Sequence, residues 1–167
     1  RSETDLSQYM LSEQIRGIWD IDTRHLPRLL RDGGAQNGCI GGGEDLDPEA
    51  LVEKARSFPG LKGMDLARVV TTEKPYGFSE GGFDLDANAF RAAAPATFKV
   101  VAYDFGVKRN ILRLLADRGC ELTVVPAETP AAEALALKPD GVFLSYGPGD
   151  PEPCAYASDA IKTFLEQ

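Results

Sequence analysis

The pattern of apolar and polar residues changes character along this chain of 167 residues. From residue 98 onward, three apolar runs alternate with segments of helical periodicity; the runs are KVVAYDF, ELTVVPA and GVFLSY, and the helical segments are VKRNILRLLADRG, AAEALALK and CAYASDAIKTFLEQ. The runs are continuously apolar and rich in β-branched residues, which is typical of parallel strands buried on both faces. Residues 98–167 are therefore predicted to form a βαβαβα unit with right-handed crossovers. In its first helix, we expect Val107, Ile111, Leu114 and Leu115 on the buried face.

The first sixty residues carry signals for two helices. In DIDTRHLPRLLRDGG, Asp22 or Thr23 is a candidate N-cap and Gly33 lies just past the expected end. A second helix is expected after Asp47, with Pro48 at its first position. Between them, AQNGCIGGG is typical of a short strand leading into a glycine turn. This part of the chain is thus predicted to contain two helices with a short strand between them.

Between residues 62 and 97 the periodicity fades and turn residues dominate. Pro75, Gly77, Gly81 and Gly82 lie close together, and a short hairpin is expected near residues 78–85. A loop of this length is unusual inside a compact domain. We therefore predict that residues 62–97 connect two domains.

Composition excludes several classes of protein. An apolar share of 43% with 26% charged residues is ordinary for a soluble globular chain. The net charge of -8 would repel a phosphate backbone, which argues against a nucleic-acid partner. No stretch approaches the roughly 20 apolar residues of a membrane span, and the N-terminus lacks an apolar signal core. We expect a cytoplasmic protein with no membrane partner.

The cysteines and the single histidine predict neither a metal site nor a catalytic one. Cys39, Cys120 and Cys154 are widely spaced, odd in number and not arranged as Cys-x-x-Cys, so no disulfide framework or zinc site is indicated. A nucleophilic cysteine needs a base beside it, and His25 lies on the surface of a different segment. Cys154 is therefore predicted to pack at the start of a helix, and no catalytic residue is expected in this chain.

Two loops follow the carboxyl ends of predicted parallel strands, where ligands bind in open α/β sheets. They are YDFGVKRN and SYGPGDPEPC, and neither contains the glycine spacing of a dinucleotide or P-loop site. In the second loop, Gly147 and Gly149 allow close approach to the main chain, and Pro148 carries no N–H. Such a turn suits backbone donors for a carbonyl oxygen that becomes an oxyanion. A plain tight turn between strand and helix is the alternative.

Four blocks in order resemble the family of small, glutamine-hydrolysing subunits of carbamoyl-phosphate synthases. The blocks are DIDTRHLPRLLRDGGAQNGCI, FPGLKGMDLARVVTT, VVAYDFGVKRNILRLLADRGC and PDGVFLSYGPGDPEPC. The resemblance implies that residues 1–61 end the small α/β N-terminal domain of the small subunit and that residues 62–97 are a connector. Residues 98–167 would then begin a class I glutamine amidotransferase domain with a flavodoxin-like parallel sheet. The chain is therefore expected to be an internal fragment.

The resemblance also implies a chemistry. Gly147 and Gly149 would bind L-glutamine and contribute to the oxyanion hole, while the family's catalytic cysteine, histidine and glutamate would follow residue 167. Ammonia would pass to a large partner subunit, which uses ATP and magnesium to make carbamoyl phosphate for arginine and pyrimidine synthesis. No cofactor is expected in this chain, and the fragment alone is expected to be inactive. Tyr146 stands where the family often has asparagine, and its ring is expected to narrow the pocket mouth.

Two alternatives remain open at this point. A non-enzymatic flavodoxin-like or receiver-like interaction module would use Asp104, with Asp150 as its only candidate partner. Another class I amidotransferase, such as the anthranilate synthase component, has a similar glycine turn but lacks the block at residues 20–40. If the three parallel strands lie in the order second, first, third (2-1-3), the strand at residues 141–146 forms an open edge of the sheet. Such an edge favours association.

Overall fold

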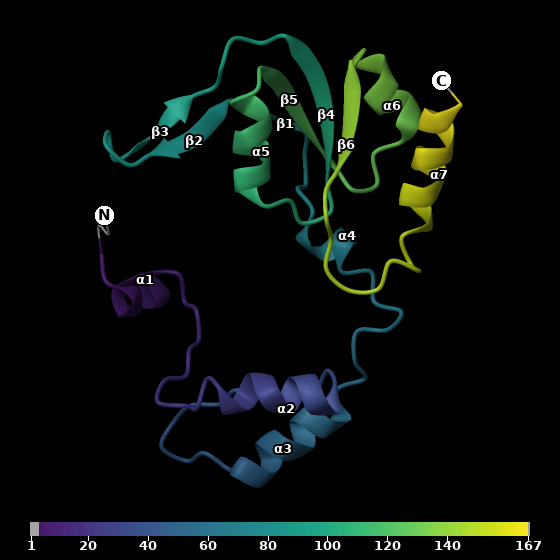
Figure 1. Cartoon of the computed structure of the whole chain (residues 1–167). Helices are drawn as coiled ribbons and strands as arrows, with labels where there is room; N and C mark the ends of the chain where they lie inside the picture. The colour runs from purple at the N-terminus through teal and green to yellow at the C-terminus, as the bar shows by residue number, and fades with distance from the viewer. Residues whose placement is uncertain (1–3, 167) are drawn as a thin grey trace. The chain divides into compact units, whose positions relative to one another are not determined.

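The computed structural model describes residues 4–166, and the chain divides into two compact units, residues 1–60 and residues 61–167. The first unit contains α1 (Leu6–Ser12), α2 (His25–Gly33) and α3 (Pro48–Ser57). The second contains α4 (Ala67–Val70), β1 (Tyr76–Phe78), β2 (Glu80–Asp84), β3 (Ala89–Ala92), β4 (Phe98–Asp104), α5 (Arg109–Ala116), β5 (Cys120–Pro126), α6 (Ala131–Ala136), β6 (Gly141–Leu144) and α7 (Ala155–Leu165). Figure 1 labels these elements.

Both predicted helices of the first unit are present. The Asp22 carboxylate accepts the N–H of His25 (2.8 Å) in the turn that opens α2. The Asp47 carboxylate accepts the N–H of Glu49 (2.9 Å), and α3 begins at Pro48 as expected. Asp47 is the N-cap of α3, and its side chain satisfies donors that have no partner within the helix. The N-cap of α2 is Arg24, so the expectation of Asp22 or Thr23 at that position was wrong.

The strand expected within AQNGCIGGG does not form. Those residues adopt no regular structure, and none of the described residues of the first unit is buried. A strand needs a paired neighbour to satisfy its backbone, and consecutive glycines weaken it further because they lose more backbone entropy than other residues. Helices are consequently the only regular secondary structure in the described part of this unit, and the expected α/β character is not found there.

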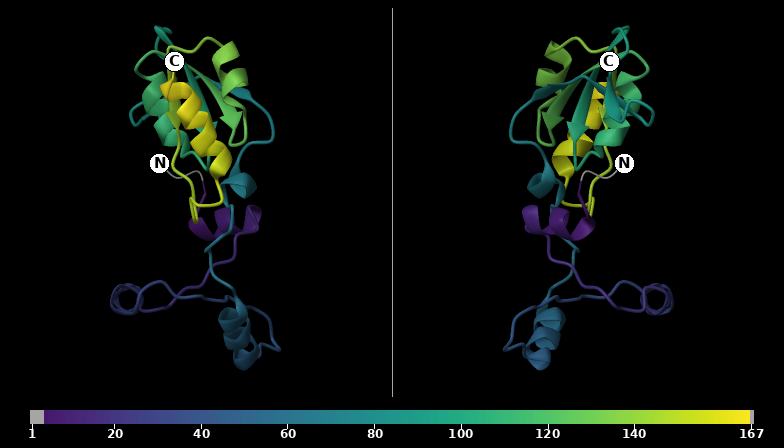
Figure 2. Two further views of the ribbon diagram at one scale, coloured as in Figure 1. Left: turned by 90° about the vertical axis from the view of Figure 1, so that its right-hand side faces the viewer. Right: turned by 90° about the vertical axis from the view of Figure 1, so that its left-hand side faces the viewer.

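The predicted βαβαβα arrangement is confirmed in the second unit. The four-stranded sheet has the order β1-β5-β4-β6, in which β4 pairs parallel to both β5 and β6. Figures 1 and 2 show α5 on one face of this sheet and α6 with α7 on the other. The three predicted parallel strands thus have the expected 2-1-3 order, with β6 at one edge.

Alternate residues of β4 enter two separate apolar cores. Val101 and Tyr103 pack with α6 and α7, whereas Ala102 packs on the opposite face with Leu112 of α5. The predicted face of α5 was partly wrong, because Leu112 is fully buried and Leu114 is 46% exposed. The helix is rotated relative to the predicted face.

Residues 61–97 differ from the expected connector, since they hold α4 and three strands and group with the second unit. β1 extends the sheet by pairing antiparallel to β5, and β2 and β3 form a hairpin. Arg113 of α5 pairs with Glu80 of β2 (2.6 Å) and lies over the ring of Phe90 in β3 (3.8 Å to the centroid). The hairpin therefore packs on α5.

Candidate functional site

The glycine turn lies where the sequence placed it, between the carboxyl end of β6 and the start of α7. A cavity of about 260 Å³ adjoins it. Its lining includes Phe105, Ser145, Gly147, Gly149, Asp150 and Cys154. The loops after β4 and β6 therefore meet at one cavity, as expected for the carboxyl ends of adjacent parallel strands.

Both glycines of the turn are required by its geometry. A Cβ added to Gly147 would lie 2.9 Å from the carbonyl oxygen of Phe105. Gly149 has φ +81°, and an added Cβ there would lie 3.1 Å from Leu66. A side chain at either position would displace a neighbour, and at Gly149 it would also strain the backbone.

The turn presents backbone donors. Within the described part of the chain, the N–H groups of Gly147 and Gly149 make no hydrogen bond to another residue. Pro148 between them has no N–H. Both glycines line the cavity, and within the described residues neither N–H group has a protein acceptor. Backbone donors of this kind are what an oxyanion-type site uses.

Ser145 joins the two loops, a role that the sequence did not indicate. Its Oγ accepts the N–H of Phe105 (2.8 Å), and its own N–H donates to the carbonyl oxygen of Tyr103 (3.2 Å). Ser145 is only 8% exposed. A buried hydroxyl with a backbone partner holds the β4 and β6 loops in fixed register.

The carboxylate of Asp104 is bonded to the backbone and does not form an open acidic site. Its Oδ1 accepts the N–H groups of Gly106 (2.9 Å) and Val107 (2.8 Å), and its Oδ2 accepts the N–H of Thr72 (2.9 Å). The residue is 7% exposed. Oδ1 is therefore occupied by the loop after β4, and Oδ2 by the segment that contains Thr72.

Asp150 follows the turn and accepts two backbone N–H groups, from Glu152 (3.0 Å) and Gly63 (2.9 Å). These hydrogen bonds lower the pKa of Asp150, so its carboxylate is charged at neutral pH. Among residues 4–166, no group of three or more acidic, histidine or cysteine side chains is placed to hold a metal ion. Asp104 and Asp150, the two aspartates considered for a receiver-like site, thus accept hydrogen bonds in different loops.

Tyr146 does not line the 260 Å³ cavity. It is 90% exposed and borders a second, more apolar hollow of about 590 Å³, together with Val70, Lys108 and Pro148. The expected narrowing of the pocket mouth by its ring is not seen. The turn directs residue 146 away from the cavity that residues 147 and 149 line.

Cys154 is partly buried against the core formed by β4 and α7, as predicted for a packing residue. Its Sγ also lies 3.6 Å from Asp65 Oδ1, a contact that the sequence did not suggest. His25 belongs to the first unit and is exposed. The absence of a catalytic residue from this chain stays a prediction, as does the assignment of Gly147 and Gly149 to glutamine.

Comparison with known proteins finds a family match in the region that contains the loops after β4 and β6. Residues 101–167 match the family model "Glutamine amidotransferase class-I". The chain is 59% identical to the carbamoyl phosphate synthase small chain of Vibrio cholerae, over 100% of this chain and 45% of that protein. It is 60% identical to that of Yersinia pestis, over 99% of this chain and 43% of that protein.

The match includes residues 1–60 as well as the amidotransferase region, although the chain spans less than half the length of these relatives. No helix among the described residues is long and apolar enough to cross a membrane. The identity extends along the whole sequence, so residues 1–167 are similar over their full length to a segment of carbamoyl phosphate synthase small chains, and residues 101–167 match the class I glutamine amidotransferase model.

Proposed function

We propose that this chain supplies the oxyanion-binding backbone of a glutamine amidotransferase, with Gly147 and Gly149 as donors to the side-chain carboxamide of L-glutamine. The observation that carries the proposal is that Gly147 and Gly149, which line the 260 Å³ cavity, have backbone N–H groups with no partner among residues 4–166. Such donors stabilise the charge that develops on a carbonyl oxygen during acyl transfer. Glycine is needed at both positions because the turn leaves no room for a side chain.

The chemistry needs a thiolate, which attacks the carboxamide carbon and forms a tetrahedral oxyanion before ammonia leaves. Water then hydrolyses the thioester through a second oxyanion. The relatives are more than twice as long as this chain, and we assign the cysteine, histidine and glutamate of the reaction to their remaining length. Residues 1–167 alone are then expected to release no ammonia.

We further propose that the ammonia goes to a large partner subunit, which consumes ATP and magnesium to form carbamoyl phosphate for arginine and pyrimidine synthesis in the cytoplasm. The support is the similarity of the whole chain to carbamoyl phosphate synthase small chains. The identity across residues 1–60 favours this family over other class I amidotransferases, for which that block is not expected. The three backbone partners of Asp104 disfavour a receiver-like module.

The test compares ammonia release from glutamine by residues 1–167 with release by a complete small chain that carries the same segment. The expected result is hydrolysis by the complete chain alone. Gly149→Ala is expected to reduce kcat about a hundredfold, because its methyl group meets Leu66 and displaces the backbone donors, and a displacement of about 1 Å costs that much in rate. Hydrolysis unchanged by that substitution would refute the role of the turn. Hydrolysis by residues 1–167 themselves would refute the assignment of the nucleophile to the remaining length.

A further inference from the structure

Residues 63–72, here named the crossing segment, run past the carboxyl ends of the central strands. At one end, the N–H of Gly63 donates to Asp150 beside the glycine turn (2.9 Å). At the other end, the N–H of Thr72 donates to Asp104 at the end of β4 (2.9 Å). Thr71 Oγ1 accepts the N–H of Ala127 after β5 (2.8 Å). The crossing segment is thus bonded to the loops that follow all three parallel strands.

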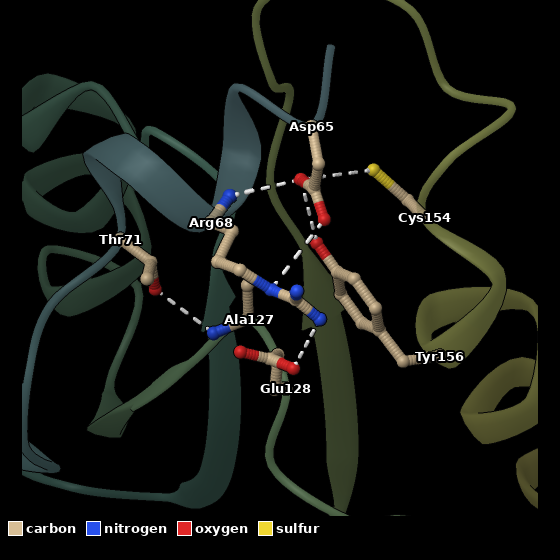
Figure 3. Close-up of polar contacts among 7 residues, drawn as sticks. All are labelled: Asp65, Arg68, Thr71, Ala127, Glu128, Cys154 and Tyr156. Carbon is tan, nitrogen blue, oxygen red and sulfur yellow. Dashed lines mark hydrogen bonds and ion pairs between the residues drawn. The ribbon is translucent and has the colours of Figure 1, made fainter. Parts of the chain in front are cut away.

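The Asp65 side chain of this segment contacts Arg68, Cys154 and Tyr156, as Figure 3 shows. Its Oδ1 accepts the Tyr156 hydroxyl (3.1 Å) and the backbone N–H of Arg68 (3.0 Å), and Cys154 Sγ lies at 3.6 Å. Arg68 also pairs through Nη2 with Glu128 after β5 (2.5 Å). The carboxylate therefore links the crossing segment to the first turn of α7.

The charge state suits this linkage. Burial opposes the ionisation of Asp65, but the hydrogen bonds from Arg68, Tyr156 and Cys154, together with the Arg68 charge, outweigh burial and lower its pKa. Burial, with hydrogen bonding to Cys154 and Asp65, raises the pKa of Tyr156. At neutral pH Asp65 is consequently an acceptor and Tyr156 a donor. Hydrogen bonds to an ionised acceptor are stronger than those between neutral groups.

The two residues after Asp65 contact the glycine turn. Leu66 fills the space beside Gly149, where an added Cβ would meet three of its side-chain carbons at 3.1 to 3.3 Å. Ala67 is buried, and its Cβ lies 3.7 Å from the position that a Cβ on Gly147 would take. The glycine turn thus packs against Leu66 and Ala67, which directly follow Asp65 in the chain.

We propose that Asp65 is a positioning residue for the glycine turn. Its carboxylate holds the crossing segment against the start of α7, and the turn is fixed between the two. Resting on the function proposed above, this arrangement sets where the N–H groups of Gly147 and Gly149 meet the oxyanion. Catalysis is sensitive to such placement, since a shift of about 1 Å in a positioned group costs about a hundredfold in rate.

The experiment compares Asp65→Asn with Asp159→Asn. The control makes the same chemical change on α7, where Asp159 is exposed and pairs only with Lys162 among the contacts described. Tyr156→Phe serves as a second variant, because it removes only the hydroxyl that donates to Asp65. The amide signals of Gly147 and Gly149 are followed by ¹H–¹⁵N NMR in residues 1–167, and kcat and KM for glutamine hydrolysis are measured in a complete small chain.

Asp65→Asn and Tyr156→Phe are each expected to shift both glycine signals and to lower kcat about tenfold with KM changed less than about twofold. The control is expected to change none of these. Unshifted glycine signals, or shifted signals with an unaltered kcat, would overturn the positioning role. Shifted signals in a protein whose unsubstituted complete chain hydrolyses no glutamine would overturn the proposed function and support the structural link between Asp65 and the turn.

Discussion

Leu66 occupies the space into which a side chain on Gly149 would project, with its Cδ1 3.1 Å from the position of an added Cβ. The two residues come from the crossing segment and from the loop after β6. Two features therefore require glycine at residue 149: the contact with Leu66 and the backbone φ of +81°.

Gly149→Ala should therefore destabilise the fold by about 1–2 kcal/mol, because alanine is strained at positive φ and its methyl group must displace Leu66. Urea unfolding of residues 1–167 measures this change. Gly141→Ala is the matched control, since no atom lies within 4 Å of an added Cβ and its φ is not positive. Equal unfolding midpoints for the two variants would contradict the prediction.

Asp104→Asn should destabilise the protein by about 2 kcal/mol. The carboxylate accepts three backbone N–H groups, and an amide presents an NH₂ group to at least one of them. Asp86→Asn, at an exposed residue of the β2–β3 turn, should change stability by less than about 0.5 kcal/mol. If Asp104→Asn unfolds at the same urea concentration as that control, its bonds contribute nothing measurable.

The lowered pKa of Asp65 predicts a loss of stability in acid. A carboxyl group whose pKa is lower in the folded than in the unfolded protein stabilises the fold above its unfolded pKa, near 3.8. That contribution disappears as the pH falls from about 5 through the folded pKa. Urea midpoints measured across this range should fall less steeply for Asp65→Asn than for the unsubstituted chain, and parallel curves would show that Asp65 does not contribute.

Tyr103 is expected to ionise only in strong alkali. Burial, with a smaller effect from the charge of Glu133, raises its pKa to about 12. Since its unfolded pKa is near 10, the fold should lose stability as the pH rises from about 10 to about 12. Tyr103→Phe should remove this dependence in ultraviolet titration and urea unfolding.

The same substitution deletes the hydroxyl that donates to the Thr129 carbonyl (2.9 Å), and it should cost about 1 kcal/mol at neutral pH. The ring contacts with Phe105 and Phe164 are retained. Tyr146→Phe is the control, because its side chain is 90% exposed. A neutral-pH effect no larger than that of the control would be inconsistent with this role of the hydrogen bond.

The edge of the sheet at β6 should promote self-association of residues 1–167. Among the described residues β6 pairs only with β4, and an edge strand presents unpaired backbone groups. Sedimentation velocity should show coefficients that rise with protein concentration. A monodisperse monomer across the range would argue against association at this edge.

The sequence by itself determined the elements that local pattern specifies. Continuous apolar runs produced β4, β5 and β6 where they were predicted, because strands buried on both faces need apolar residues throughout. Asp47 and Pro48 marked the start of α3, and the glycine turn was located from its residues alone. The resemblance to carbamoyl phosphate synthase small chains also followed from four short blocks, and the comparison with known small chains confirmed it.

Only the tertiary structure decided what surrounds the turn. Asp65 and Tyr156 are 91 positions apart, and Asp104 and Thr72 are 32 apart, so no local periodicity relates them. β1 is only three residues long and includes a glycine, and its pairing with β5 appears only once the parallel sheet exists. Leu112 and Leu114 are equally apolar, and the packing of α5 on the sheet selects which one is buried. Contacts between distant segments depend on how the sheet brings loop ends together. The pattern of apolar and polar residues along the sequence does not predict that arrangement.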